Sequence, residues 1–233
     1  EMAATASDAD RLEIGVLASG GLDSCILLSH ILEQGHSVRP FYVCSGQFWQ
    51  DEELRQLNRY LQRVGTERLR DLVLLDLPLR DLYDGHWSIT GDGVPDDSTA
   101  DEAVYLPGRN MLLTIKAALW CQIRGIGQLA LATLHSNPFA DASDEFFDAY
   151  QTALNYGATT NIAIIRPFAA LSKREVMHLG RNYPLQETFS CIAPIAGLHC
   201  GRCNKCAERK AAFATAEMPD PTVYSSSSLF PRP

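Results

Sequence analysis

Two groups of residues in this 233-residue chain have types and spacings that can do chemistry. The first is the run Ser19-Gly20-Gly21-Leu22-Asp23-Ser24, which follows apolar residues 14–18 and opens an amphipathic stretch at Asp23. A strand that ends in a glycine turn and leads into a helix points backbone N–H groups outward, and the helix dipole adds positive potential. The run therefore predicts an anion site for nucleotide phosphates, with an ordinary strand–turn–helix corner as the alternative. No Gly-Lys-Ser/Thr occurs in the chain, which excludes the P-loop kinase pattern.

The second group consists of four cysteines near the C-terminus: Cys191, Cys200, Cys203 and Cys206. Four thiolates fill the tetrahedral shell of a structural zinc site and leave no open position for catalysis. A redox-active C-x2-C pair and buried cysteines without a metal are the alternatives. We predict structural Zn²⁺, with His199 as a neighbour of the site instead of a ligand. The remaining cysteines lie in apolar contexts and are predicted to be small core residues: Cys25, Cys44 and Cys121.

Composition limits the class of protein. The chain is 46% hydrophobic and 21% charged, as expected of one large globular domain with a small appendage. Its net charge is −8 and no window gathers Lys and Arg, which argues against a nucleic-acid partner. We find no signal peptide and no apolar run near the roughly 18 residues that a membrane helix needs, so no membrane partner and a cytoplasmic location are expected. Residues 1–10 are rich in Ala, Asp and Ser without a pattern, and the Glu that precedes Met2 looks like an expression scar, so no fold element is predicted there.

Strands and helices alternate along the chain. Strands are predicted over residues 14–18, 37–44, 71–77, 128–134 and 161–166. Helices are predicted over 51–64, from just after Asn110 to about Arg124, and over 144–155 and 172–181. The last helix opens with the capping-box spacing of Ser172 and Glu175. This alternation predicts an α/β fold with a doubly wound parallel sheet, whose ligands bind at the carboxyl ends of the strands.

The remaining segments complete the predicted organisation. Residues 85–103 lack periodicity and are predicted to form a long mobile loop. Gly125 to Ala130 fits a G-x-G-x-x-A dinucleotide pattern but precedes a strand, so we interpret it as a helix C-cap and turn. The predicted domains are a nucleotide domain over 11–184, a zinc knuckle with its helix over 185–216, and a Pro/Ser-rich tail over 217–233.

The glycine-turn sequence resembles the pyrophosphate loop of the N-type ATP pyrophosphatases. Together with Leu106-Pro-Gly-Arg-Asn110 and the four cysteines, it makes residues 13–213 similar to the 7-cyano-7-deazaguanine synthase (QueC) family. The resemblance implies an adenine nucleotide alpha hydrolase-like fold, ATP and Mg²⁺ at the loop, Zn²⁺ at the cysteines, and a homodimer. The implied substrates are a 7-deazaguanine carboxylate and ammonia or another amine.

The resemblance also implies roles for individual residues. Ser19, Gly20, Gly21, Leu22 and Ser24 would bind ATP, while Asp23 would hold Mg²⁺ or its water; a helix first-turn acid is the alternative for Asp23. Arg109 and Lys173 would neutralise charge on the transferring phosphoryl group, with solvent-exposed positions as the alternative. Three further residues would contact the deazaguanine: Gln47 and Asp141 at its edge, and Trp49 by stacking, unless Trp49 is only core.

Two stretches depart from the family pattern. The family's Tyr-Gly-Gln-x-His motif corresponds to residues 45–49 of this chain, where Trp49 replaces the His. The Glu that follows this motif in the family is present here as Glu52. Residues 135–143 correspond to the family's Asp-x-Ser-Gly-Tyr-Pro-Asp-Cys-Arg motif. Of the two acidic residues in that motif this chain has only Asp141, and it lacks the Cys and the Arg. Three hypotheses follow. The first is a synthase that adenylates the carboxylate, forms the amide and converts it to the nitrile. The second is a ligase that stops at the amide and uses another amine, including one on a protein partner. The third is a non-catalytic nucleotide-binding module.

Overall fold

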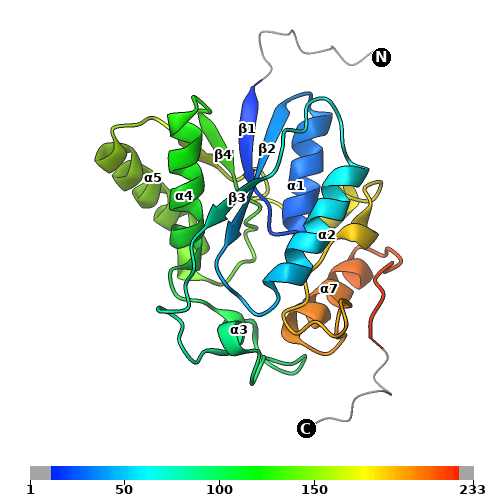
Figure 1. The fold of residues 1–233 in the computed structure, drawn as a ribbon. Helices are drawn as coiled ribbons and strands as arrows, with labels where there is room; N and C mark the ends of the chain where they lie inside the picture. The colour runs from blue at the N-terminus through cyan, green and yellow to red at the C-terminus, as the bar shows by residue number, and fades with distance from the viewer. Residues whose placement is uncertain (1–11, 226–233) are drawn as a thin grey trace, which may run out of the picture.

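A computed structural model describes residues 12–225 of the chain. Its centre is a parallel five-stranded sheet with strand order β3-β2-β1-β4-β5, shown in Figure 1. The strands are β1 (Glu13–Leu17), β2 (Ser37–Cys44), β3 (Val73–Asp76), β4 (Gln128–Ala130) and β5 (Ala163–Ile165). Strand order reverses between β1 and β4, which is where a doubly wound sheet opens a ligand crevice. The predicted fold class is confirmed.

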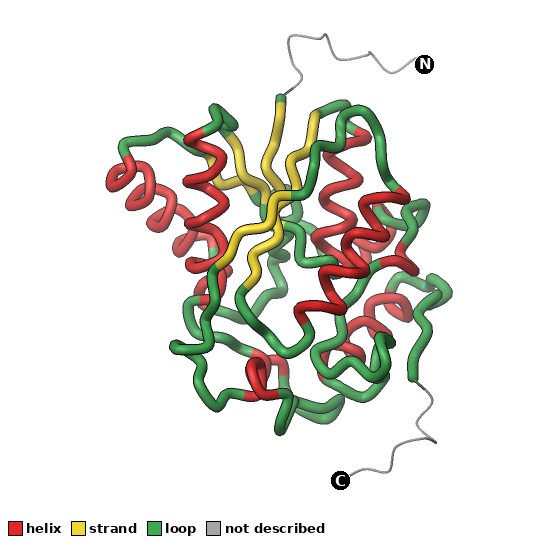
Figure 2. The backbone as a smooth tube through the Cα atoms, in the orientation of Figure 1, coloured by secondary structure: helices red, strands yellow, loops and turns green. Residues whose placement is uncertain are grey.

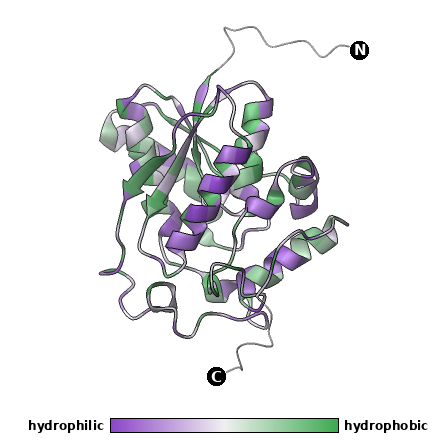
Figure 3. Ribbon diagram, turned by 45° about the vertical axis from the view of Figure 1, so that its right-hand side comes forward, coloured by the Kyte–Doolittle hydropathy of each residue, from purple (hydrophilic) through white to green (hydrophobic). Residues whose placement is uncertain are grey.

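Helices cover both faces of the sheet (Figures 1 and 2). The longer ones are α1 (Leu22–Glu33), α2 (Gln50–Arg63), α4 (Arg109–Ile123), α5 (Asp144–Ala158), α6 (Lys173–Leu179) and α7 (Asn204–Thr215). Helices α1, α2, α6 and α7 share one hydrophobic core with the sheet, and α4 and α5 share the other. In Figure 3 the strands are hydrophobic and much of the hydrophilic colour lies on the surrounding helices. A parallel sheet covered on both faces requires this distribution.

Close backbone approaches bring the helices onto the sheet and onto one another. A Cβ at Gly15 of β1 would lie 2.7 Å from the Sγ of Cys121 in α4. A Cβ at Gly180, just after α6, would lie 2.5 Å from a side-chain carbon of Ile26 in α1. Both glycines therefore allow contacts that any side chain would block. Cys121 is buried in the core as predicted, as is Cys25, whereas Cys44 is only partly buried.

Strand β4 ends four residues earlier than predicted. Its ladder with β1 stops at the pair Val16–Ala130, because β1 itself ends at Leu17 and turns into the glycine loop. Residues 131–133 follow β4 and line the cavity described below, although the amide of Leu131 still donates to Ile165 O of β5 at 2.9 Å. The apolar run misled the prediction, because periodicity does not show where a partner strand ends.

Residues 85–103 are not an irregular loop throughout, so this prediction is wrong in part. They contain the one-turn helix α3 (Trp87–Thr90) and part of the 3₁₀ helix Asp101–Val104. The segment also joins the cysteine knuckle: the amide of Asp97 donates to Arg202 O at 3.0 Å, and that of Asn204 to Pro95 O at 2.9 Å. A four-residue helix held by distant partners leaves no periodic signal in the sequence.

The smaller predictions have mixed outcomes. Ser172 and Glu175 form the predicted capping box, and Gly125 has a positive φ of 74° in the turn between α4 and β4. The three-part division of the chain stays a prediction, although the described part of the tail (217–225) packs on the knuckle, where Thr222 accepts from Arg209 at 2.6 Å. The predictions for residues 1–10 and for 226–233 lie outside the described residues. Within residues 12–225, no helix is long and apolar enough to cross a membrane.

Candidate active site

The glycine turn is held between α2 and the C-terminal segment. Gly20 has a φ of +81°, and a Cβ there would lie 3.2 Å from the carbonyl oxygen of Glu53. From the other side, the amide of Phe189 donates to Gly20 O at 2.7 Å. The positive φ and the close contact with α2 together require glycine at this position.

The serines of the turn fix its shape. Ser24 Oγ accepts from the Ser19 amide and donates to Gly21 O, both at 3.2 Å, and it lies 3.2 Å from Ser19 Oγ. Helix α1 begins at Leu22, so the amides of its first turn have no acceptor within the helix. Helix amides without an acceptor, at the positive end of the helix dipole, are what a phosphate cradle needs. The role of this turn, called the cradle below, as a phosphate site stays a prediction.

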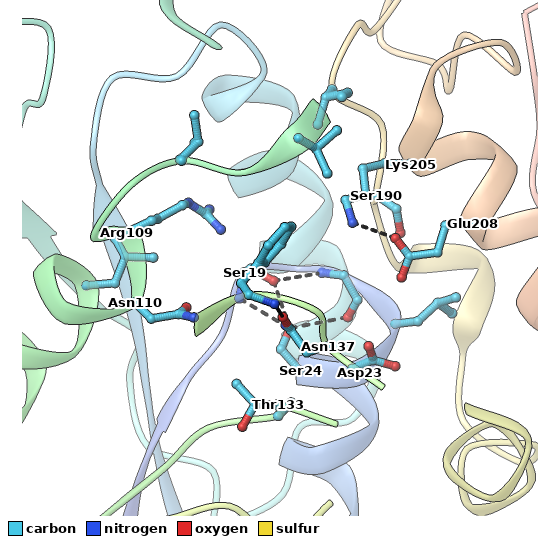
Figure 4. Close-up of a pocket in the computed structure, with 18 of the residues that line it drawn as sticks. Ser19, Asp23, Ser24, Arg109, Asn110, Thr133, Asn137, Ser190, Lys205 and Glu208 are labelled. Atoms are coloured by element: carbon cyan, nitrogen blue, oxygen red, sulfur yellow. Dashed lines mark hydrogen bonds and ion pairs between the residues drawn. The ribbon is translucent and has the colours of Figure 1, made fainter. Parts of the chain in front are cut away.

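The cradle lies in the wall of a cavity of about 360 Å³ at the carboxyl ends of β1 and β4. Figure 4 shows Arg109 on one side of this cavity, Lys205 and Glu208 facing it from the other, and Ser19 and Ser24 between them. Most of the predicted site residues line it: Ser19, Gly21, Leu22, Asp23, Ser24, Trp49, Arg109, Asp141 and Lys173. Residues from five separate parts of the chain are thus brought together.

Asp23 and Lys173 form an ion pair at the cradle. The ammonium nitrogen of Lys173 lies 2.9 and 2.7 Å from the two carboxylate oxygens of Asp23. Burial raises the pKa of Asp23, and Lys173 opposes that shift. Burial by itself lowers the pKa of Lys173, but Asp23 and Glu208 outweigh it and raise this pKa. The lysine is therefore held as a cation at the edge of the phosphate cradle.

Arg109 reaches the cavity from the N-terminus of α4. Its Nε is buried and has no hydrogen-bond partner within residues 12–225. The hydroxyls of Thr114 and Thr133, which also line the cavity, are likewise buried and unpartnered there. Buried polar groups in native proteins are almost always paired, so these three groups are available to a bound ligand or to water in the cavity.

Asp141 holds the start of α4. Its carboxylate accepts from the amide of Asn110 at 3.1 Å and from the Asn110 side-chain nitrogen at 3.2 Å. The adjacent Arg109 is thereby held at the cavity. A carboxylate accepts more than two hydrogen bonds, so a contact with a substrate remains compatible with this arrangement. The predicted substrate role of Asp141 stays a prediction.

The two other predicted substrate residues lie in different surroundings. Gln47 is buried outside the cavity lining, where its side-chain oxygen accepts from the Ser45 hydroxyl. Trp49 does line the cavity, but its ring stacks on Trp87, with centroids 5.8 Å apart and planes 21° apart. The sequence offered no reason to pair Trp87 with Trp49, because Trp87 lies in the segment that was predicted to be a loop.

Glu53 is a cavity residue that sequence reasoning missed. Its carboxylate accepts from the hydroxyl of Tyr42 at 2.7 Å. Burial raises the pKa of Glu53 to about 7, against the opposing effects of Arg109 and of hydrogen bonds from Tyr42 and Trp49. The family pattern pointed to Glu52 instead, which pairs with Arg55. Two adjacent glutamates in one helical turn differ only in the face they occupy, and packing decides which one meets the cavity.

The four predicted cysteines form one buried cluster. Their sulfur atoms all lie within 4.8 Å of one another, and Cys203 is the N-cap of α7. All four cysteines are buried, so the cluster is shielded from solvent. His199 Nε2 accepts from the Ser190 amide at 3.2 Å and stands outside the cluster. Four soft, converging sulfur ligands fit a tetrahedral Zn²⁺.

Comparison with known proteins identifies the family of the chain. The model of the family described as queuosine biosynthesis protein QueC matches residues 13–217. The chain belongs to this family. A 7-cyano-7-deazaguanine synthase of Nitrosospira multiformis is 30% identical over 90% of this chain and 94% of its own length. The synthase of Methanothermobacter thermautotrophicus is 27% identical over 89% of this chain and 97% of its own.

Similarity to solved structures is more remote. A predicted subunit of tRNA methyltransferase from Methanocaldococcus jannaschii is 15% identical, covers 73% of this chain and 74% of its own, and has a TM-score of 0.48. The QueC match is more informative, because it spans both the glycine turn and the four cysteines and ends near the start of the tail. The glycine turn and the four cysteines therefore both lie within the part of the chain that the family model matches.

Proposed function

We propose that this chain is an ATP-dependent enzyme that converts 7-carboxy-7-deazaguanine and ammonia into 7-cyano-7-deazaguanine. The observation that carries the proposal is the glycine-turn cradle with Asp23, Lys173 and Arg109 around one cavity. The shared name of its full-length relatives supports the choice of carboxylate and product.

In the first step, a carboxylate oxygen of the substrate attacks the α-phosphate of ATP. The bond to the bridging oxygen breaks, pyrophosphate leaves in the cradle, and an acyl adenylate remains. Lys173 and Arg109 stabilise the charge that develops on the phosphoryl oxygens. Mg²⁺, which the carboxylate of Asp23 suits, would neutralise charge between the phosphates. The Asp23–Lys173 pair holds both groups at the cradle before ATP arrives.

The second step replaces AMP by ammonia. The nitrogen lone pair attacks the acyl carbon, AMP leaves with one of the original carboxylate oxygens, and the amide forms. We propose Glu53 as the group that takes the ammonium proton, because it lines the cavity and changes charge near neutral pH. A second ATP then activates the amide oxygen, and loss of AMP with both amide protons yields the nitrile.

One observation favours the alternative ligase that stops at the amide. Asn137 and Phe139 line the cavity, and both come from the stretch 135–143 that departs from the family pattern. The cavity wall therefore differs at a stretch where the family has a recognisable sequence pattern. The count of AMP per product molecule separates the two reactions: the synthase forms two AMP for each nitrile, whereas the ligase forms one AMP for each amide. Absence of carboxylate-dependent AMP would refute both.

A further inference from the structure

A chain of four alternating charges crosses from the phosphate cradle to the cysteine knuckle. Lys173 Nζ lies 2.7 Å from Asp23 Oδ2 and 3.6 Å from Glu208 Oε1. The other oxygen of Glu208 lies 2.6 Å from Lys205 Nζ. Glu208 thus uses one oxygen for each lysine. All four side chains line the cavity, and Lys205 and Glu208 both belong to α7, which begins at the knuckle.

Helix α7 is fixed to the cradle by a buried arginine. Arg209 is 1% exposed and donates to Thr188 Oγ1 at 2.8 Å and to Leu185 O at 2.9 Å. The same segment carries Phe189, whose amide donates to Gly20 of the glycine turn. The position of Glu208 relative to the cradle is therefore set by buried contacts and does not depend on its own ion pairs.

We propose that Glu208 is a positioning residue that keeps the Lys173 ammonium at the phosphates when the nucleotide engages Asp23. Lys173 needs a second carboxylate partner because Asp23, in its proposed role, turns from Lys173 to Mg²⁺ when the nucleotide binds. Without a partner, the negative charge of the Glu208 carboxylate would repel a nearby triphosphate. The ammonium of Lys205 offsets this negative charge. Such partly exposed ion pairs add little stability by themselves. This inference rests on the proposed function and deepens it.

The first test measures the state of Lys173 without turnover. In Glu208→Gln, the amine of Lys173 should react severalfold faster with an amine-directed acylating reagent, as quantified by peptide mass spectrometry. Loss of the carboxylate removes one of the two groups that stabilise the ammonium form. The matched control is Glu217→Gln, whose carboxylate pairs at 3.0 Å with Arg174, the neighbour of Lys173 in α6. The control should leave Lys173 labelling unchanged.

The second test separates positioning from loss of structure. In Glu208→Gln, kcat for AMP formation should fall about tenfold or more, because Lys173 has no carboxylate anchor once the nucleotide engages Asp23. The KM for ATP should stay the same or fall, since Lys205 loses its partner and adds positive potential. Glu208→Asp should recover part of kcat. Zinc content and melting temperature equal to wild type would show that α7 is intact.

Two results would overturn the inference. One is unchanged labelling of Lys173 in Glu208→Gln. The other is a raised KM with unchanged kcat, which a loosened helix would produce. A wild-type protein that forms no AMP with any carboxylate would refute the proposed function instead, and the labelling test would still decide the role of Glu208.

Discussion

The ammonium of Lys173 lies 2.7 Å from a carboxylate oxygen of Asp23, although the two residues are 150 positions apart in the chain. Asp23 stands in the first turn of α1, directly after the glycine turn, and Lys173 begins α6. The packing of α6 on α1 around Gly180 therefore brings a cation to the nucleotide cradle.

The first prediction concerns this pair. Lys173→Met should lower kcat for AMP formation by about 10²-fold or more, because one cation of the phosphate site is lost. Arg174→Met is the matched control, since Arg174 is exposed and pairs only with Glu217 among residues 12–225. Steady-state kinetics of AMP release would measure both variants. Equal activity of Lys173→Met and wild type would contradict the proposed role.

The second prediction concerns the pH dependence of Glu53. Its pKa is about 7 in the folded chain and ordinarily about 4.5, so between these values the folded state binds a proton that the unfolded state has lost. This difference makes the folding free energy less favourable as pH rises from 4.5 to 7. Glu53→Gln removes the proton-binding difference, so the stability of wild type relative to this variant should fall over that range. Urea midpoints at several pH values would measure it, and a constant difference would refute the shifted pKa.

Glu53→Gln should also change the pH profile of the reaction. If Glu53 accepts the ammonium proton, the wild-type rise in amide formation with an apparent pKa near 7 should disappear in the variant, with a low rate remaining. ATP binding, followed by calorimetry, serves as the control and should persist. If the rate of amide formation in the variant still rises with an apparent pKa near 7, a group other than Glu53 accepts the proton.

The third prediction concerns the glycine turn. Gly20→Ala should destabilise the fold by more than the roughly 1–2 kcal/mol expected for a positive φ alone, because the new Cβ would also lie 3.2 Å from the Glu53 carbonyl. Gly35→Ala isolates the backbone effect, since Gly35 has a φ of +90° and no atom within 4 Å of the built Cβ. Denaturant unfolding would compare them. Equal losses of unfolding free energy in the two variants would show that the contact with α2 adds nothing to the requirement for glycine at position 20.

The fourth prediction concerns the metal. Native mass spectrometry should find one zinc ion per chain, and chelation should lower the melting temperature and speed acylation of Lys173, because Cys203 caps α7. Cys203→Ser should have the same effects. Cys44→Ser is the control, since Cys44 lies outside the cluster and should change neither readout. Full retention of stability in the metal-free chain would exclude a structural site.

The two active groups were predictable because each is local in sequence. The glycine turn is six consecutive residues and the cysteines lie within one short segment, so spacing alone reports their geometry. The sheet was predictable for a similar reason, since its strands are apolar runs between helices. Strands β3, β4 and β5 are all shorter than predicted, and the largest error is at β4, whose end depends on where β1 stops pairing.

The cavity wall was less predictable because it depends on packing between distant segments. Trp87 meets Trp49 only when residues 85–103 fold against the knuckle. Glu53, not Glu52, faces the cavity because of the rotation of α2 on the sheet, which one sequence does not report. Gln47 matched a family pattern, yet the structure buries it outside the lining.

The fate of the carboxylate oxygens tests the proposed reaction most directly. The protein would be incubated with ATP, Mg²⁺, ammonium and 7-carboxy-7-deazaguanine labelled with ¹⁸O in both carboxylate oxygens. Mass spectrometry should then find 7-cyano-7-deazaguanine and two AMP molecules for each nitrile, each carrying one ¹⁸O in its phosphate. Product formation with no ¹⁸O in AMP, or no AMP at all, would contradict adenylation of the carboxylate.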